Sequence, residues 1–311
     1  MLKSAGRFLY MDMARLPFIK TYSSPAQLAS ILQSRGLHID NKIRVENYLR
    51  TIGYYRLSAY LYPLLKLPKE QHQFKIGSTF DQALDMYRFD RHLRLLLFNQ
   101  IEKIEIAVRS SIVNITSKET GDPFWITNPA NFANKVEFQK TLSLIKSEYN
   151  RSREDFIKHF RVTYSNQYPP AWIIAEILPI GVLTSIYKNL ASHQVRKKIA
   201  KEFDLNVPVF NSWMTIITLT RNSCCHHARV WNRDWSLQTR TMRRMNRPWI
   251  SASVKQGKIF YTLCIIKYFI NIIAPTNDMT GKIIRLLAEY PNIDISAMGF
   301  SANWNQEEVW Q

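Results

Sequence analysis

A short stretch in the last third of the chain, residues 221–233 (RNSCCHHARVWNR), combines residue types that could act on a phosphodiester. A histidine such as His226 can exchange a proton near neutral pH, which general acid–base catalysis on a 2′-hydroxyl requires. Arginine is always charged and can hold phosphate oxygens with its planar fork of donors. Asn222 could orient the imidazole one turn away. We therefore take Arg221, Asn222 and His226 as the candidate catalytic residues.

The spacing of apolar residues predicts the element that would position this set. The apolar residues recur mostly at intervals of three and four, as on one face of a helix: Phe210, Trp213, Met214, Ile217, Cys224, Ala228 and Trp231. One long helix is expected over this stretch, with Asn222, His226, Arg229 and Arg233 as a polar stripe beside the apolar one. His227 would lie about 100° round that helix and should matter less to chemistry. A structural alternative is that histidine and arginine near a helix end only cap carbonyls and complement the helix dipole.

At these residues the sequence resembles a known family. Arg221, Asn222 and His226 match the R-N-x-x-x-H signature of the HEPN superfamily, and the string RNSCCHHARVWNR resembles more narrowly the bacterial abortive-infection proteins of the AbiD and AbiF type. Further segments are similar to that family, in the family's order: IGYYRLSAYLYP (52–63), YRFDRHLRLLL (87–97), IEKIEIAVRSSI (101–112), YPPAWIIAEILPIG (168–181) and MGFSANW (298–304). Only the first fifteen or so residues lie outside the resemblance. It implies an all-α, HEPN-like helical bundle with N-terminal and C-terminal helical extensions, and a metal-independent endoribonuclease toxin of phage defence.

The resemblance also implies a homodimer, because catalysis in such a family needs two motifs that face each other and this chain has one complete copy. Arg109 and Asn114 repeat the spacing of Arg221 and His226, but asparagine cannot move a proton. Two copies of His226 would then share the acid and base duties, Arg221 would neutralise the phosphate, and a cyclic phosphate would be the product. A cytoplasmic location is expected. RNA would be the substrate, and a neutralising non-coding RNA would be a further partner.

The charge balance independently points to a polyanion. Lys and Arg number 42 against 24 Asp and Glu, which gives a formal net charge of +18. Besides the stripe, the candidate RNA-binding residues are Arg240, Arg243, Arg244 and Arg247 after the motif, Arg88, Arg91 and Arg94 on one face of a predicted helix, and Arg56 among tyrosines. With Arg229 and Arg233 they would guide an RNA backbone. The alternative is that these arginines form a solvated basic face.

Composition and turn signals predict a mostly helical chain. Hydrophobic residues make up 46% and there are only nine glycines, while alternating strand patterns are nearly absent. Helices are expected at residues 24–35, 41–62, 80–116, 136–160 and 278–290. We predict a leader or a mis-assigned start at residues 1–15 and a single all-helical domain over 16–311, with a HEPN-like core at about 80–235.

Cysteine, acidic and apolar patterns limit other kinds of site. Three cysteines without C-x-x-C spacing (Cys224, Cys225 and Cys264) indicate neither disulfides nor zinc, and no ligand cluster surrounds the motif, so no metal or cofactor is expected. The cysteines should pack as small apolar residues. Glu102 and Glu105 should pair with cations one turn away, such as Arg109. A further hypothesis has Glu176 hold an arginine of the polar stripe.

Two other classes of function stay open at this stage. A non-catalytic module could use the same arginines to hold a structured, antitoxin-like RNA. A membrane-acting toxin would depend on the apolar run at 259–274, but this run is interrupted by Lys267 and Asn271 and is shorter than the roughly 20 residues that span a bilayer. We read it as a buried core helix and expect no membrane partner.

Overall fold

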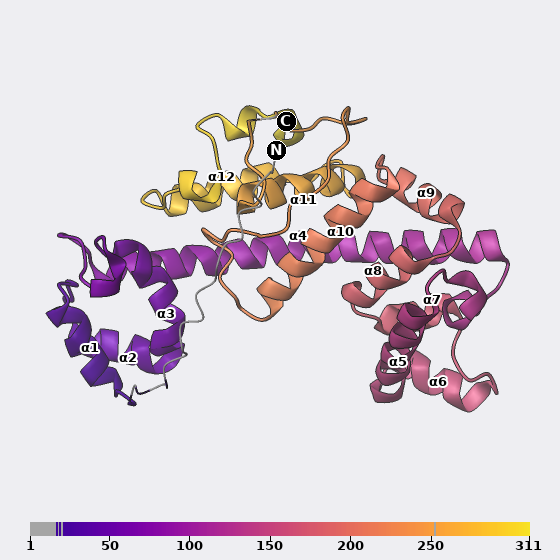
Figure 1. Cartoon of the computed structure of the whole chain (residues 1–311), viewed down its shortest axis with the longest axis horizontal. Helices are drawn as coiled ribbons and strands as arrows, with labels where there is room; N and C mark the ends of the chain where they lie inside the picture. The colour runs from indigo at the N-terminus through magenta and orange to yellow at the C-terminus, as the bar shows by residue number, and fades with distance from the viewer. Residues whose placement is uncertain (1–16, 18, 20, 252) are drawn as a thin grey trace, which may run out of the picture. The chain divides into compact units, whose positions relative to one another are not determined.

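The computed structural model describes residues 17, 19, 21–251 and 253–311, and their regular elements are helices (Figure 1). Isolated β-bridges occur among the described residues, but no sheet does. The predicted all-α class is confirmed. The leader predicted at 1–15 lies outside the described residues. The chain divides into two compact units, one that ends at Leu84 and one from Asp85 to Gln311. The single domain expected over 16–311 stays a prediction.

The first unit is built from short helices. Helix α1 (Pro25–Ser34) starts with a capping box, in which Ser24 and Gln27 each bind the other's backbone N–H, and Pro25 occupies the first turn. The single helix predicted at 41–62 is wrong: α2 (Lys42–Tyr48) and α3 (Tyr54–Leu61) are separated by a π-helical turn, Leu49–Gly53. Gly53 has φ +91°, which interrupts regular α-helix and which glycine adopts without steric cost.

The longest element is α4 (Phe80–Thr120), whose 41 residues extend the helix predicted at 80–116. At 1.5 Å per residue it is about 60 Å long. Its buried residues recur at helical spacing and include Phe89, Leu93, Leu97, Ile101, Ile104, Val108 and Ile112. The helix therefore offers one continuous apolar face on which other helices pack.

The other helices of the second unit are α5 (Lys135–Arg151), α6 (Asp155–Thr163), α7 (Ala171–Ile174), α8 (Ile180–Asn189), α9 (His193–Glu202), α10 (Val207–Cys225), α11 (Ile259–Ile273) and α12 (Met279–Glu289). The predicted single helix at 136–160 is wrong, because Ser152 is extended and its hydroxyl accepts the N–H of Glu154, which breaks the chain into α5 and α6. The predicted core helix at 259–274 is confirmed, since nearly every residue of α11 is buried. Among the described residues, no helix combines the length and the apolar character that crossing a bilayer would require.

Helix α10 carries the candidate motif and is firmly fixed at its N-terminal half. Asn206 caps it by accepting the N–H of Val209 at 2.9 Å. The helix packs against α8, α9 and α11 and crosses α4 (Figure 1). Trp213, fully buried, stacks on Trp249 with 4.7 Å between ring centroids and meets Tyr268 edge-on at 5.1 Å. These ring contacts fix the N-terminal half of α10 against α11 and the segment that contains Trp249.

Candidate active site at the end of α10

Helix α10 ends within the motif, so the long helix predicted to continue to Trp231 is wrong. His226 is the C-cap residue, and His227 adopts a left-handed conformation with φ +54°. The N–H of His227 donates to the carbonyl of Cys224 at 3.1 Å and that of Ala228 to the carbonyl of Ser223 at 2.8 Å. These two bonds form a Schellman motif, which satisfies the last carbonyls and turns the chain away from the helix axis.

The polar stripe is consequently shorter than predicted. Asn222 and His226 stay one turn apart, joined by a 3.0 Å bond from the N–H of His226 to the carbonyl of Asn222, and both side chains are exposed. Arg229 and Arg233 do not continue the stripe, because they lie on the irregular segment after the turn. Arg233 instead reaches back, donating to Ser223 Oγ at 3.1 Å and stacking 4.5 Å from the ring centre of Trp235.

Glu105 of α4 connects the motif to a second arginine. Its carboxylate lies 3.6 Å from Nε of Arg221 and 3.1 Å from Nη2 of Arg109. The predicted pairing of Glu105 with Arg109 is confirmed, whereas the contact with Arg221 was missed, because nothing local in the sequence links α4 to α10. Glu176 pairs with Arg109 of α4 at 3.7 Å. Arg109 does not belong to the polar stripe, so the hypothesis that Glu176 holds an arginine of the stripe is wrong.

Asp90 of α4 holds the chain that follows the motif. The side chain is fully buried, and Oδ1 accepts the N–H of Val230 at 3.1 Å and of Trp231 at 2.6 Å. Oδ2 accepts a hydrogen bond from Arg94, whose side chain is only 7% exposed. Arg94 therefore neutralises Asp90 in the interior, and its predicted role in RNA binding is corrected to a structural one.

The other predicted RNA-binding arginines are at the surface with different partners. Arg88 pairs with Asp85 at 3.3 Å and Arg247 with Asp204 at 2.6 Å. Exposed positions are also occupied by Arg91, Arg240, Arg243 and Arg244 in the second unit and by Arg56 on α3 in the first. The segment after the motif folds back along α10: the N–H of Arg240 donates to Ser212 Oγ at 2.9 Å, and Nε1 of Trp213 donates to the carbonyl of Arg240 at 2.9 Å.

Two of the three cysteines, Cys224 in the motif and Cys264 on α11, are unsuited to nucleophilic attack. Burial raises the pKa of Cys224 to about 12 and also raises the pKa of the fully buried Cys264, so both stay protonated thiols. Their predicted packing role agrees with this burial. Within the part of the chain that the structure describes, no three His, Cys, Asp or Glu side chains are grouped as metal ligands. Metal independence itself stays a prediction.

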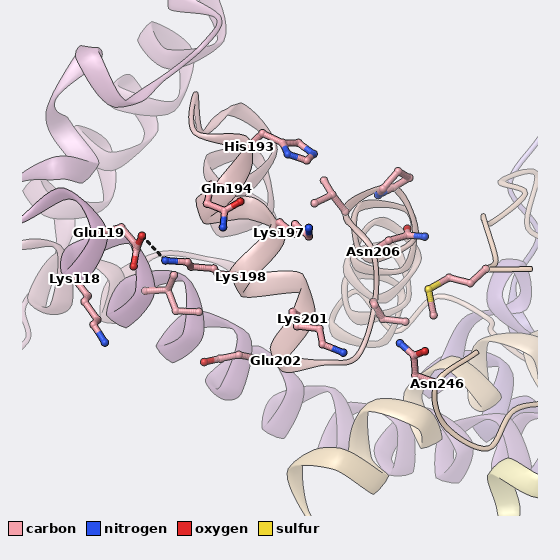
Figure 2. Close-up of a pocket in the computed structure, with 15 residues that line it drawn as sticks. Lys118, Glu119, His193, Gln194, Lys197, Lys198, Lys201, Glu202, Asn206 and Asn246 are labelled. Atoms are coloured by element: carbon pink, nitrogen blue, oxygen red, sulfur yellow. Dashed lines mark hydrogen bonds and ion pairs between the residues drawn. The ribbon is translucent and has the colours of Figure 1, made fainter. Parts of the chain in front are cut away.

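Sequence patterns also missed a basic cavity of about 850 Å³ between α9 and the start of α10 (Figure 2). Its wall on α9 carries His193, Lys197, Lys198 and Lys201, and Lys198 pairs with Glu119 at 2.6 Å. Arg221, Asn222 and His226 do not line it. The lysines on α9 are not marked by a motif, and only the overall excess of positive charge could have hinted at them.

A comparison with known families identifies a match. A family model described as Abi-like protein matches residues 47–232, more than half of the chain, and this span includes α4, α10 and the whole R-N-x-x-x-H motif. No match was found among curated proteins or solved structures. The chain belongs to the Abi-like protein family.

Proposed function

We propose that this Abi-like protein acts in abortive infection as a metal-independent endoribonuclease of the HEPN type. The observation that carries the proposal is the arrangement at the end of α10. His226 is exposed and makes no side-chain hydrogen bond with another described residue, Asn222 lies one turn before it, and Arg221, the residue before Asn222, pairs with Glu105 at 3.6 Å. The last turns of α10 thus carry a group that can transfer a proton and a permanent cation, the two functions that the proposed reaction needs.

The chemistry follows from these positions. His226 would accept the proton of an RNA 2′-hydroxyl, whose oxygen then bonds to the adjacent phosphorus. The bond from phosphorus to the 5′-oxygen breaks, and the second copy's His226 would donate a proton to that leaving oxygen. Arg221 contacts Glu105 through Nε, so its two terminal amino groups can face the phosphate oxygens as negative charge builds. The products are a 2′,3′-cyclic phosphate and a 5′-hydroxyl.

The outer face of α4 supports the homodimer that this mechanism needs. Leu95, Phe98 and Ile106 are 56%, 41% and 55% exposed, and at 100° per residue they lie within an arc of about 80°. Ile106 is next to Glu105, which holds Arg221. A second copy that packs on this apolar face would bring its own motif close to the first, and the two-fold symmetry would make both faces equivalent.

Cleavage of labelled RNA by purified protein in excess EDTA tests the function. We expect cyclic-phosphate ends from the unmodified protein, and a loss of roughly a hundred- to ten-thousandfold in rate for His226→Ala, with RNA affinity retained. His227→Ala is the matched control and should cleave nearly as well as the unmodified protein. Cleavage that needs added magnesium, or that is lost equally in both variants, would contradict the mechanism.

The alternative, a non-catalytic module that holds a structured RNA, is favoured by the surface arginines after the motif. The same experiment separates the two functions. If the protein binds RNA tightly but does not cleave it, and His226→Ala leaves that binding unchanged, the protein is an RNA-binding module and the enzymatic function is refuted.

A further inference from the structure

A second cavity, of about 530 Å³, lies beside the N-terminal half of α10 and is strongly basic. Three separate segments supply its charged lining: Lys188 from α8, His193 and Arg196 from α9, and Arg240 from the segment after the motif. Polar residues of α10 complete it, and the described residues that line it include no carboxylate. Three basic side chains without a compensating acid among the described lining residues favour an anionic ligand.

The interior of this cavity has unused hydrogen-bonding capacity. The side-chain oxygen of Asn211 and Nε of Arg196 are buried and have no hydrogen-bond partner within the described chain. Leaving a buried polar atom unpaired is energetically unfavourable, so such atoms are found where a ligand or water can complete their hydrogen bonds. Nζ of Lys188 donates only to the hydroxyl of Thr215, at 2.6 Å, and burial lowers its pKa. An anion beside Lys188 would favour its charged form.

The cavity and the catalytic motif lie on the same side of α10. Asn211, Thr215 and Asn222 are four and seven residues apart, so at 100° per residue their directions agree to within about 40°. At 1.5 Å per residue, Thr215 is about 10 Å and Asn211 about 16 Å from Asn222 along the helix. Stacked nucleotides advance by about 3.4 Å each, so this distance corresponds to roughly three to five nucleotides.

We propose that this cavity binds a backbone phosphate of the RNA strand that is cleaved at His226, about three to five nucleotides from the scissile bond. The proposal rests on the proposed function, because it takes the strand at the motif to be RNA. It predicts that the substrate is a single strand longer than the motif alone would need, since duplex RNA could not follow one helix face into a cavity of this size. Lys188, Arg196 and Arg240 would surround the phosphate.

The cavity in Figure 2 continues from this one, because both are lined by His193, Val207 and Pro208. Its lysines are partly neutralised: Lys198 pairs with Glu119, and Lys201 with Asp204 at 3.1 Å. The strand would therefore leave the phosphate site toward a weaker basic surface. The uncompensated charge is greatest at the smaller cavity, which makes it the place to test.

The test combines Lys188→Gln with Arg240→Gln and measures affinity for single-stranded RNA as a function of salt. Probes are a labelled ten-nucleotide strand and a trinucleotide too short to reach the cavity. We expect about tenfold weaker binding of the longer strand and a slope of log K against log salt that is flatter by about 0.7, the value of one phosphate contact. Trinucleotide binding and cleavage should not change. The control, Lys140→Gln with Arg151→Gln on α5, removes the same charge and should leave the slope unchanged.

Each outcome separates the phosphate site from catalysis. A folded double variant with an unchanged slope would overturn the proposal; if the double variant does not fold, Arg240→Gln alone, at an exposed position, gives the same reading with a smaller change. If the double variant has the flatter salt slope but the unmodified protein does not cleave RNA, the phosphate site is supported and the proposed enzymatic function is refuted. Pyrophosphate could instead stabilise the unmodified protein and not the double variant, while the two proteins bind RNA with equal affinity. That result would show a site for free phosphate and overturn the assignment to an RNA strand.

Discussion

Two carboxylates of α4 hold the two sides of the candidate motif, in different surroundings. Asp90 is fully buried and binds the chain after the motif through the backbone N–H groups of Val230 and Trp231. Glu105 has a side chain that is 14% exposed and binds Arg221, the first residue of the motif, through one contact at 3.6 Å. Both oxygens of Asp90 accept hydrogen bonds, whereas Glu105 and Arg221 form an ion pair that is too long for a hydrogen bond.

The difference shows how one helix can serve stability and chemistry separately. Asp90 and Arg94 are both buried, so neither can move away without leaving the other as an unpaired buried charge. Arg221 is 29% exposed and shares Glu105 with Arg109, so it is oriented and still able to turn its amino groups toward a substrate. Asp90 therefore stabilises the fold, and Glu105 orients Arg221, which we propose to be catalytic.

Removing the buried carboxylate should have the largest effect. In Asp90→Ala, Arg94 stays buried without a counter-ion, and two backbone N–H groups lose their acceptor. We expect the free energy of unfolding to fall by about 3–5 kcal/mol, measured by urea denaturation followed through tryptophan fluorescence. Asp155→Ala removes an exposed pair with Lys158 and should not change stability measurably. Equal stability of the two variants would refute the structural role of Asp90.

The outer face of α4 between the two carboxylates gives the next effect. Phe98→Glu places a charge on the apolar face proposed for the second copy, so the protein should become monomeric by light scattering and lose cleavage about as strongly as His226→Ala. The variant should still fold, with an unchanged far-ultraviolet circular dichroism spectrum, because Phe98 is exposed in the single chain. Val136→Glu, at an exposed position of α5, is the control. A Phe98→Glu protein that is still dimeric and active would move the interface elsewhere.

Glu105→Gln should affect chemistry more than stability. The amide keeps the shape of the side chain but no longer orients Arg221 by charge, so the single-turnover cleavage rate should fall by about ten- to a hundredfold. RNA affinity should be equal or higher, because a negative charge is removed. Glu176→Gln is the matched control, since Glu176 contacts Arg109 and not Arg221. If both changes slow cleavage alike, the effect passes through Arg109 instead.

The sequence predicted what local patterns control. The long apolar period of α4 and the buried run of α11 could be read directly, since each helix buries one stripe or its whole surface. The end of α10 could not, because Ala228 and Trp231 keep the helical spacing although the chain has already turned at His227. The pairing of Glu105 with Arg221 and the cavity at Lys188 depend on tertiary contacts between distant segments, which spacing along one helix does not encode.

The smallest expected effect concerns the turn between the two anchored sides. His227 adopts φ +54°, a conformation that costs a residue with a Cβ about 1–2 kcal/mol and costs glycine almost nothing. His227→Ala and His227→Gly both remove the imidazole, so the difference between them isolates the backbone. We expect the glycine variant to be more stable by roughly 1 kcal/mol, measured as the difference in unfolding free energy in urea. Its cleavage rate should match that of the alanine variant, because His226 stays at the C-cap in both. A glycine variant that is less stable than the alanine one would mean that the extra backbone entropy of glycine in the unfolded chain outweighs the strain of the left-handed conformation at this position.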